Sequence, residues 1–308
     1  MNIKITGSGS YIPTERVSNL DFAKHSFLNE DGSQFPHPNE VVAQKFLEIT
    51  GIEERRYVTD DLTASDIAAI AAQRAIEDAK IDPETLDYII LAHNFGDVKK
   101  GAIQSDILPS LASRVKYTLK IKNPKCVAYD ILFGCPGWIE GVIQAQAYIK
   151  AGMAKKCLVI GAETLSRVVD MHDRDSMIYS DGAGATIIEA TEEEGGILAH
   201  ESATFAYDEA YYLFFGNSFN KDHDPDVRYI KMYGRKIYEF ALRHVPDAMK
   251  AALDHAGVDL KDVKKIFMHQ ANAKLDHWHA VLLPTAQGPL ITANDLAQFE
   301  LADYLAHH

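Results

Sequence analysis

Residues 133–141 read FGCPGWIEG and place Cys135 between a glycine and a proline. The stretch that leads into them, CVAYDILF (126–133), is β-branched, aromatic and mostly apolar, which predicts a buried strand. The stretch PGWIEGVIQAQAYIKAG has apolar residues at helical spacing, begins at Pro136 and stops at Gly152, which predicts a helix. Cys135 is therefore expected on a strand-to-helix turn of an α/β fold.

This position has a chemical consequence for Cys135. The first backbone N–H groups of a helix have no partner inside the helix and carry partial positive charge, so they favour a thiolate over a thiol. The thiolate is the nucleophilic form of cysteine. The alternative is a small buried residue that fills space beside a tight turn, as most free cysteines do. The turn alone leaves both interpretations open.

Composition restricts the class of protein. The chain has 308 residues, of which 47% are hydrophobic and 24% charged, as in a soluble globular enzyme with one large core or two fused domains. No uncharged run is long enough for a membrane helix, and the N-terminus predicts a strand and a turn instead of a secretion signal. We expect a cytoplasmic protein without a membrane partner.

Cysteine usage and net charge exclude further classes. Three scattered cysteines, at 126, 135 and 157, are too few for a disulfide framework and form no CxxC pair, which is typical of a reducing compartment. A net charge of −13 disfavours nucleic acid as the main partner. His277 and His279 form an HxH pattern without a third ligand at the usual spacing, so no metal site is expected.

Predicted strands and helices alternate along the chain, separated by glycine and proline residues, which predicts α/β layering. Strands are expected at ITGSGSYIP, DYIILAHNF, CVAYDILF, KCLVIGAE and GATIIEA, and a helix at TASDIAAIAAQRAIEDA. The GSGS of residues 7–10 lacks the GxGxxG pattern, so we expect a turn there and not a nucleotide site. Residues 29–40 are polar and rich in turn formers and predict a surface loop.

An internal similarity suggests two related halves. AIEDAKIDPETLDYIILAH (75–93) aligns without a gap with ALDHAGVDLKDVKKIFMHQ (252–270), and each copy predicts helix, turn and strand; a chance match is the alternative. The break falls near residue 190, where EATEEEGG is charged. In the second copy a predicted strand, KIFM, leads into His269, and open α/β sheets build sites at the carboxyl ends of strands. A hydrogen-bonded structural histidine is the other interpretation.

Four motifs in order resemble a known family. They are TGIEERR (50–56), YDILFGCPGWIEG, LVIGAETLSRVVDMHDRDSMIYSDGAGATIIEA and KIFMHQAN. With this order and spacing the chain resembles the thiolase-fold condensing enzymes, and among them β-ketoacyl-ACP synthase III, from Met1 to about Lys274. The resemblance implies a thiolase-like α/β fold of two halves in α-β-α-β-α layers. The halves would be residues 1–190, with the cysteine, and 191–308, with the histidine and a divergent tail at 275–308.

The resemblance also implies roles for individual residues. Cys135 is similar to the acyl-accepting nucleophile, and His269 to the histidine that stabilises the enolate during decarboxylative condensation. Arg174 falls where the family has an arginine beside the adenine of coenzyme A, and Asn272 where an asparagine lines the pantetheine tunnel. Lys274, as a phosphate-binding candidate, and Gly234 complete the expected donor-binding set, and the DGAGA of residues 181–185 is expected to be structural.

The chain departs from the family pattern in two places. Residues after Lys274 contain no glycine-asparagine motif for the second enolate-binding side chain, and Asn294 lies in a predicted capped helix. Lys45 and Ile49 occupy positions where the family's coenzyme A site usually has an aromatic residue and an arginine. This makes a carrier-protein donor a reasonable substitute for acetyl-CoA. Basic residues would then face the acidic carrier, and the candidates are Arg235, Lys236, Lys264, Lys265 and Lys274. The alternative for each is an ordinary solvated surface charge.

Three functions compete at this point. The leading one is an acyl-thioester condensing enzyme that takes an acyl group from acyl-CoA or acyl-ACP onto Cys135 and condenses it with a malonyl thioester in fatty acid or polyketide initiation. The second is an acyltransferase to an alcohol or amine, with His269 as general base. The third is a non-catalytic partner subunit. A homodimer without a permanently bound cofactor is expected.

Overall fold

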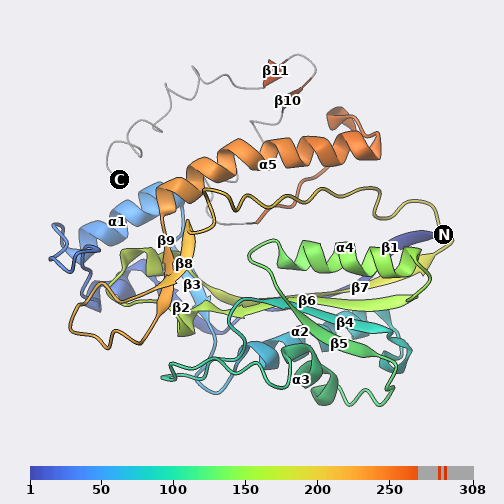
Figure 1. The fold of residues 1–308 in the computed structure, drawn as a ribbon, viewed down its shortest axis with the longest axis horizontal. Helices are drawn as coiled ribbons and strands as arrows, with labels where there is room; N and C mark the ends of the chain where they lie inside the picture. The colour runs from blue at the N-terminus through green and yellow to red at the C-terminus, as the bar shows by residue number, and fades with distance from the viewer. Residues whose placement is uncertain (270–283, 286–287, 290–308) are drawn as a thin grey trace. The chain divides into compact units, whose positions relative to one another are not determined.

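The computed structural model describes residues 1–269, 284–285 and 288–289 (Figure 1). The chain divides into two compact units that are discontinuous in sequence. The first unit comprises Met1–Val17, Arg55–Val168 and Tyr179–Leu198, and the second comprises Ser18–Glu54, Val169–Ile178 and Ala199–His308. The division into halves at residue 190 stays a prediction.

A five-stranded mixed sheet forms the centre of the first unit. Its strands, in spatial order, are β1 (Asn2–Tyr11), β7 (Asp181–Thr191), β6 (Lys156–Thr164), β4 (Tyr88–His93) and β5 (Val127–Leu132). Strand β4 runs parallel to β5 and β6, whereas β7 is antiparallel to β1 and β6. Each strand overlaps a segment in which the sequence predicts a strand, and the expected α/β layering is confirmed in this unit. The prediction that residues 126–133 form a buried strand is wrong in its burial, because β5 lies at the edge of the sheet and Val127 and Leu132 are exposed.

Helices cover both faces of this sheet (Figure 1). Helices α2 (Ala64–Ala79) and α3 (Leu111–Thr118) pack on one face, where Leu91, Leu158 and Ile187 are fully buried. Helix α4 (Gly137–Lys150) packs on the other, over Ile90, Val159 and Ile188. Adjacent strand residues therefore point into different hydrophobic cores, as the two-residue period of a strand requires. The remaining elements of this part are β2 (Glu15–Ser18), β3 (Glu54–Tyr57), η2 (Pro83–Thr85) and η3 (Leu165–Arg167).

The prediction of a turn at residues 7–10 is wrong, because these residues lie inside β1. The two glycines let helix α2 approach the strand closely. A Cβ atom on Gly7 would lie 2.5 Å from the carbonyl oxygen of Ala75, and one on Gly9 only 2.2 Å from that of Ala71. The alanine face of α2 and the glycines of β1 thus form one tight interface, a use of glycine that resembles turn composition in the sequence.

Replacing Gly9 with alanine is expected to lower the free energy of unfolding by about 1–3 kcal/mol, because the helix backbone must move to admit the methyl group. Gly184, its near neighbour on β7, is the matched control, since a Cβ atom there meets nothing within 4 Å. Urea unfolding of both variants measures the difference. Equal loss of stability in the two would contradict the tight β1–α2 packing.

The second unit contains shorter elements. They are η1 (Asn19–Lys24), α1 (Asn39–Thr50), η4 (Arg174–Ile178), β8 (Leu213–Gly216), β9 (Tyr229–Met232), α5 (Gly234–Ala256), η5 (Leu260–Asp262), β10 (Pro284–Thr285) and β11 (Gly288–Pro289). Strands β8 and β9 form an antiparallel pair, and so do β10 and β11. Across the described residues, no helix has the length and apolar character that crossing a membrane requires.

The strand predicted at KIFM is wrong. After η5, residues 263–269 are irregular, and Phe267 is 86% exposed. A strand is stable only where a neighbour completes its hydrogen bonds and a core covers one face. Among the described residues no strand pairs with this segment. The helix and turn of the internal similarity do form, as the end of α5 and η5.

Candidate active site

Cys135 lies on the turn between β5 and α4, as the sequence predicts, and its side chain is exposed. Pro136 caps α4, and the N–H of Gly137 donates to the carbonyl oxygen of Gly134 at 2.8 Å, which closes the turn. A Cβ atom on Gly137 would lie 2.8 Å from that of Ala92 on β4. The lack of a side chain at Gly137 therefore lets the amino end of α4 pack directly on β4. This end of the helix, which follows Cys135 in the chain, favours negative charge.

Glu163 lies near the carboxyl end of β6, on the face of the sheet that α4 covers. Gly161 of β6 faces Trp138 of α4, so Glu163, two residues further along the strand, points to this face as well. Its Oε2 accepts the backbone N–H of Asn94 at 2.7 Å and the side-chain amide of Asn94 at 3.1 Å. Burial raises the pKa of Glu163 in spite of these hydrogen bonds. Glu163 thus ties the chain after β4 to β6.

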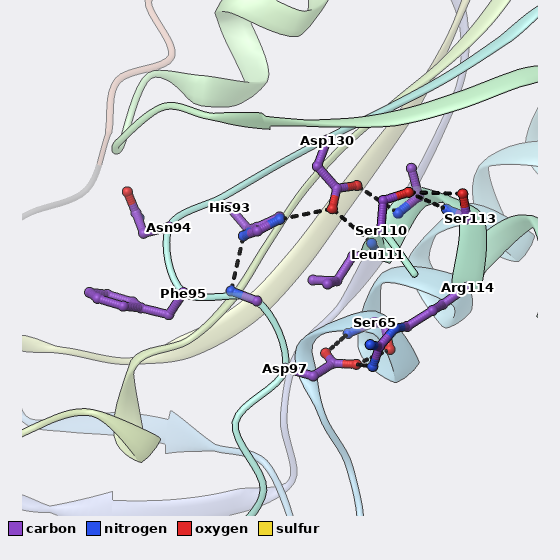
Figure 2. A network of polar contacts seen from close by, with 12 residues as sticks. Ser65, His93, Asn94, Phe95, Asp97, Ser110, Leu111, Ser113, Arg114 and Asp130 are labelled. Carbon is purple, nitrogen blue, oxygen red and sulfur yellow. Dashed lines mark hydrogen bonds and ion pairs between the residues drawn. The ribbon is translucent and has the colours of Figure 1, made fainter. Parts of the chain in front are cut away.

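On the opposite face, His93 and Asp130 form a buried pair (Figure 2). His93 is 3% exposed, and its Nδ1 accepts the N–H of Gly96 at 3.0 Å. The proton of the ring therefore sits on Nε2, which donates to Oδ2 of Asp130 at 3.1 Å. Because both ring nitrogens are engaged, His93 has no lone pair left with which to act as a general base on Cys135.

Asp130 also holds the start of helix α3 (Figure 2). Its carboxylate accepts the N–H groups of Leu111 at 2.7 Å and Ala112 at 2.8 Å. Burial opposes ionisation, but the hydrogen bonds from His93 and from these two N–H groups outweigh it and lower the pKa of Asp130. Asp130 lies on β5, so it joins the strand that leads to Cys135 with α3 and with the loop after β4.

The loop between β4 and α3 is fixed at its base by a second carboxylate, Asp97 (Figure 2). Asp97 accepts the N–H and the hydroxyl of Ser65 at 2.7 and 2.6 Å, and it pairs with Arg114 at 2.7 Å. These residues border a polar pocket of about 830 Å³, which is lined by the start of α2 and by the loop. Cys135 is not among the residues that line this pocket, so it is separate from the predicted nucleophile.

We expect Asp130→Ala to lower the free energy of unfolding by about 3 kcal/mol, because three buried donors lose their acceptor. A carboxylate with a lowered folded-state pKa stabilises the fold above its unfolded pKa, and this contribution is lost as pH falls through the folded-state pKa. The stability gap between wild type and variant should therefore narrow as the pH falls below about 4.

Denaturant unfolding at several pH values tests this prediction. Asp254→Ala, which removes only an exposed pair with Lys250 on α5, is the control and should change stability by less than about 0.5 kcal/mol. An Asp130→Ala gap that is small, or that stays constant through the acid range, would contradict the assigned role.

The other predicted site residues belong to the second unit or lie outside the described residues. His269 lies in the irregular segment after η5 and is exposed, whereas Cys135 belongs to the first unit. Asn272 and Lys274 lie outside the described residues. Arg174 begins η4 and Gly234 begins α5, and both lie beside Asp175.

Asp175 lies near both Arg174 and Gly234, and together with Phe35 they form what we call the Arg174 corner. The guanidinium carbon of Arg174 lies 5.0 Å from the ring centroid of Phe35, a cation–π contact. Its Nε lies 3.9 Å from Oδ1 of Asp175. A Cβ atom on Gly234 would lie 3.6 Å from Oδ2 of Asp175. An aromatic ring and a guanidinium therefore lie together at this corner.

A buried ion cluster holds this corner in place. Lys231, on the strand before α5, is 3% exposed and contacts Asp170 at 2.6 Å and Asp173 at 3.0 Å. Asp173 also accepts the N–H of Asp175 at 2.9 Å. Loss of Lys231, or of the two aspartates, would leave an unpaired buried charge. These ion pairs attach the segment that carries Arg174 to β9.

Sequence reasoning did not identify five of these side chains: Phe35, His93, Asp130, Glu163 and Asp175. A signal was present for two of them, because Asp130 interrupts an apolar strand and His93 ends one. For Phe35 and Asp175 no local pattern exists.

The chain is similar in sequence to a family of known enzymes. Residues 129–205 match the family model described as 3-oxoacyl-[acyl-carrier-protein (ACP)] synthase III. A beta-ketoacyl-[acyl-carrier-protein] synthase III of Erythrobacter litoralis is 34% identical over 276 residues, 88% of this chain and 78% of the relative. One of Oceanobacillus iheyensis is 33% identical over 277 residues, 89% of this chain and 78% of the relative.

Solved structures agree. The crystal structure of 3-oxoacyl-[acyl-carrier-protein] synthase III from Aquifex aeolicus is 29% identical, with a TM-score of 0.74 over 99% of this chain and 91% of that one. The synthase from Thermus thermophilus is 27% identical, with a TM-score of 0.73 over 98% and 91%. The expected thiolase-like fold is therefore confirmed.

Proposed function

Because the chain belongs to the β-ketoacyl-[acyl-carrier-protein] synthase III family, we propose that it is an acyl-thioester condensing enzyme of fatty acid biosynthesis with Cys135 as its nucleophile. The observation that carries the assignment of Cys135 is its place: an exposed thiol at the amino end of a 14-residue helix, on a turn that glycine packing fixes to the sheet. The two other cysteines, Cys126 and Cys157, are buried.

The first step transfers the acyl group. The Cys135 thiolate attacks the thioester carbonyl of acyl-CoA or acyl-ACP, and the carbonyl π electrons move to oxygen. The backbone N–H of Cys135 stabilises this oxyanion. When the carbonyl re-forms, the donor's carbon–sulfur bond breaks and the donor leaves as a thiolate. The product is an acyl thioester on Cys135.

The second step forms the carbon–carbon bond. A malonyl thioester loses carbon dioxide, and the electrons of the broken bond produce an enolate whose oxygen His269 stabilises by an N–H donor. The enolate carbon attacks the acyl group on Cys135. Collapse of that adduct expels the Cys135 thiolate and releases a β-ketoacyl thioester. The reaction needs no permanently bound cofactor and no metal.

Donor recognition is assigned to the second unit. Arg174 and the ring of Phe35 offer a cation and an aromatic face to the adenine nucleotide end of coenzyme A, beside Gly234. Asn272 would line the pantetheine tunnel, and Lys274 would contact a phosphate. For an acidic carrier protein, Arg235, Lys236, Lys264 and Lys265 are exposed in the same unit. We further propose a cytoplasmic homodimer.

Trapping the acyl-enzyme tests this function. Intact mass spectrometry after incubation with acyl-CoA and acyl-ACP donors should show the mass of one acyl group added, and peptide mapping should place it on Cys135. Cys126 and Cys157 serve as internal controls because their thiols are buried. If no donor gives an adduct, or if the adduct maps to another residue, the proposal is contradicted.

A further inference from the structure

An acidic side chain occupies the Arg174 corner where an anionic ligand is expected. The carboxylate of Asp175 lies between the guanidinium of Arg174, with Oδ1 3.9 Å from Nε, and the first residue of α5, with Oδ2 3.6 Å from the Cβ position of Gly234. A 23-residue helix presents partial positive charge at this end. Asp175 therefore offsets the two groups of the corner that would attract a phosphate.

The carboxylate is held in this place and is still reachable from solvent. The N–H of Asp175 donates to Asp173, which pairs with the buried Lys231. The side chains of Arg174 and Asp175 keep 38% and 36% of their surface exposed. A ligand that reaches Arg174 therefore meets the carboxylate as well.

The surroundings of Asp175 disfavour its charged form. Burial, followed by the charge of Asp173, raises its pKa to about 6, against the opposing charges of Arg174 and Lys231. On α5, Arg235 pairs with Glu239, and Lys236 lies over the rings of Tyr212 and Tyr233. Above its pKa, Asp175 cancels the charge of Arg174, whereas below it the corner carries a net positive charge.

We propose that Asp175 is a specificity-determining residue that weakens recognition of the polyanionic nucleotide end of a coenzyme A donor and so favours donors that lack this nucleotide. The inference rests on the proposed function, in which Arg174 meets that nucleotide. It accounts for a corner that keeps an arginine and an aromatic ring but places a carboxylate beside them. Protonation of Asp175 relieves the discrimination.

The test compares two donors that differ only in the nucleotide end. The measured quantity is the ratio of kcat/KM for acylation of Cys135 by acyl-CoA to that by acyl-pantetheine, in which effects on Cys135 itself cancel. At pH 7.5, Asp175→Asn should raise this ratio by about three- to tenfold, since an unfavourable charge beside the ligand's phosphates is removed. At pH 5.5 the wild-type ratio should approach that of the variant. Titration of the ligand's own phosphate affects both proteins equally.

Controls separate the failure of this proposal from failure of the function. Asp254→Asn makes the same charge change at the far end of α5 and should leave the ratio unchanged. If Arg174→Ala lowers the ratio but Asp175→Asn does not raise it, the specificity role of Asp175 is wrong and the function stands. If neither variant changes the ratio, the Arg174 corner does not bind the nucleotide, and the proposal is overturned with it.

A binding measurement makes the outcome independent of chemistry at Cys135. In calorimetric titration with coenzyme A, Asp175→Asn should bind about three- to tenfold more tightly than wild type at pH 7.5. Tighter binding without any acylation of Cys135 would support Asp175 and sink the proposed function. Unchanged binding would overturn the role of Asp175 whatever Cys135 does.

Discussion

Replacing Cys135 with alanine is expected to lower the rate of β-ketoacyl thioester formation by about 10³-fold or more, because no other group can carry the acyl chain between the two steps. The side chain is exposed on its turn, so the fold should be unaffected. Product formation is measured by mass spectrometry of the thioester pool, and thermal unfolding checks the fold.

Cys126→Ala is the matched control for this variant. It removes a thiol that is 1% exposed and packs in the core between the sheet and α2 and α3. We expect it to reduce stability modestly and to keep condensation activity per folded molecule. Full activity of Cys135→Ala, or equal loss in both variants, would show that Cys135 is not the acyl carrier.

The second large effect is expected at His269. His269→Ala should slow decarboxylation of a malonyl thioester by about 10²–10³-fold, because the enolate oxygen loses a hydrogen-bond donor. Acylation of Cys135 should remain within about twofold of wild type, since the first step uses the turn at α4 instead. Release of labelled carbon dioxide measures the rate of the second step. Single-turnover mass spectrometry measures the rate of the first.

His255→Ala provides the comparison within the same unit. His255 is exposed at the end of α5 and contacts Glu201 at 3.3 Å, so its loss should leave both steps unchanged. His269→Gln keeps an N–H donor and should recover part of the decarboxylation rate. A His269→Ala enzyme that decarboxylates normally would remove His269 from the mechanism and favour a role in the irregular segment's packing.

The first unit could be predicted largely from its sequence. Strands β4, β5 and β6 are apolar runs bounded by turn-forming residues, and α2 has a capping box of Thr63 and Asp66 before its alanine-rich face. These signals are local, so they survive without knowledge of the neighbours. The same holds for Cys135, because a strand, a Gly-Cys-Pro turn and a helix are contiguous in the chain.

The errors arose where a residue's neighbour is distant in the sequence. Glycines 7 and 9 indicate a turn by composition, but they lie in a strand that pairs with β7 and packs closely against α2. The apolar KIFM segment has strand composition, yet no described strand pairs with it. A local pattern specifies what a segment prefers, and the tertiary partner decides the outcome.

The polar contacts around the site could not be predicted from the sequence for the same reason. Phe35 and Arg174 are far apart in the chain, and only the fold of the second unit brings the ring to the guanidinium. Asp175 is adjacent to Arg174 in sequence, but its significance depends on Gly234, where α5 begins. In the sequence Asp130 is a single charged residue in an apolar strand. Only the fold shows that His93 and the start of α3 hydrogen-bond to it.

The most direct test of the condensing function is a single reaction with an acyl donor and a malonyl thioester labelled in its free carboxyl group. The account predicts a β-ketoacyl thioester that is longer than the donor's acyl chain by two carbons, with one labelled carbon dioxide released for each product formed. Transfer of the acyl group from Cys135 to an alcohol or amine without release of labelled carbon dioxide would contradict it.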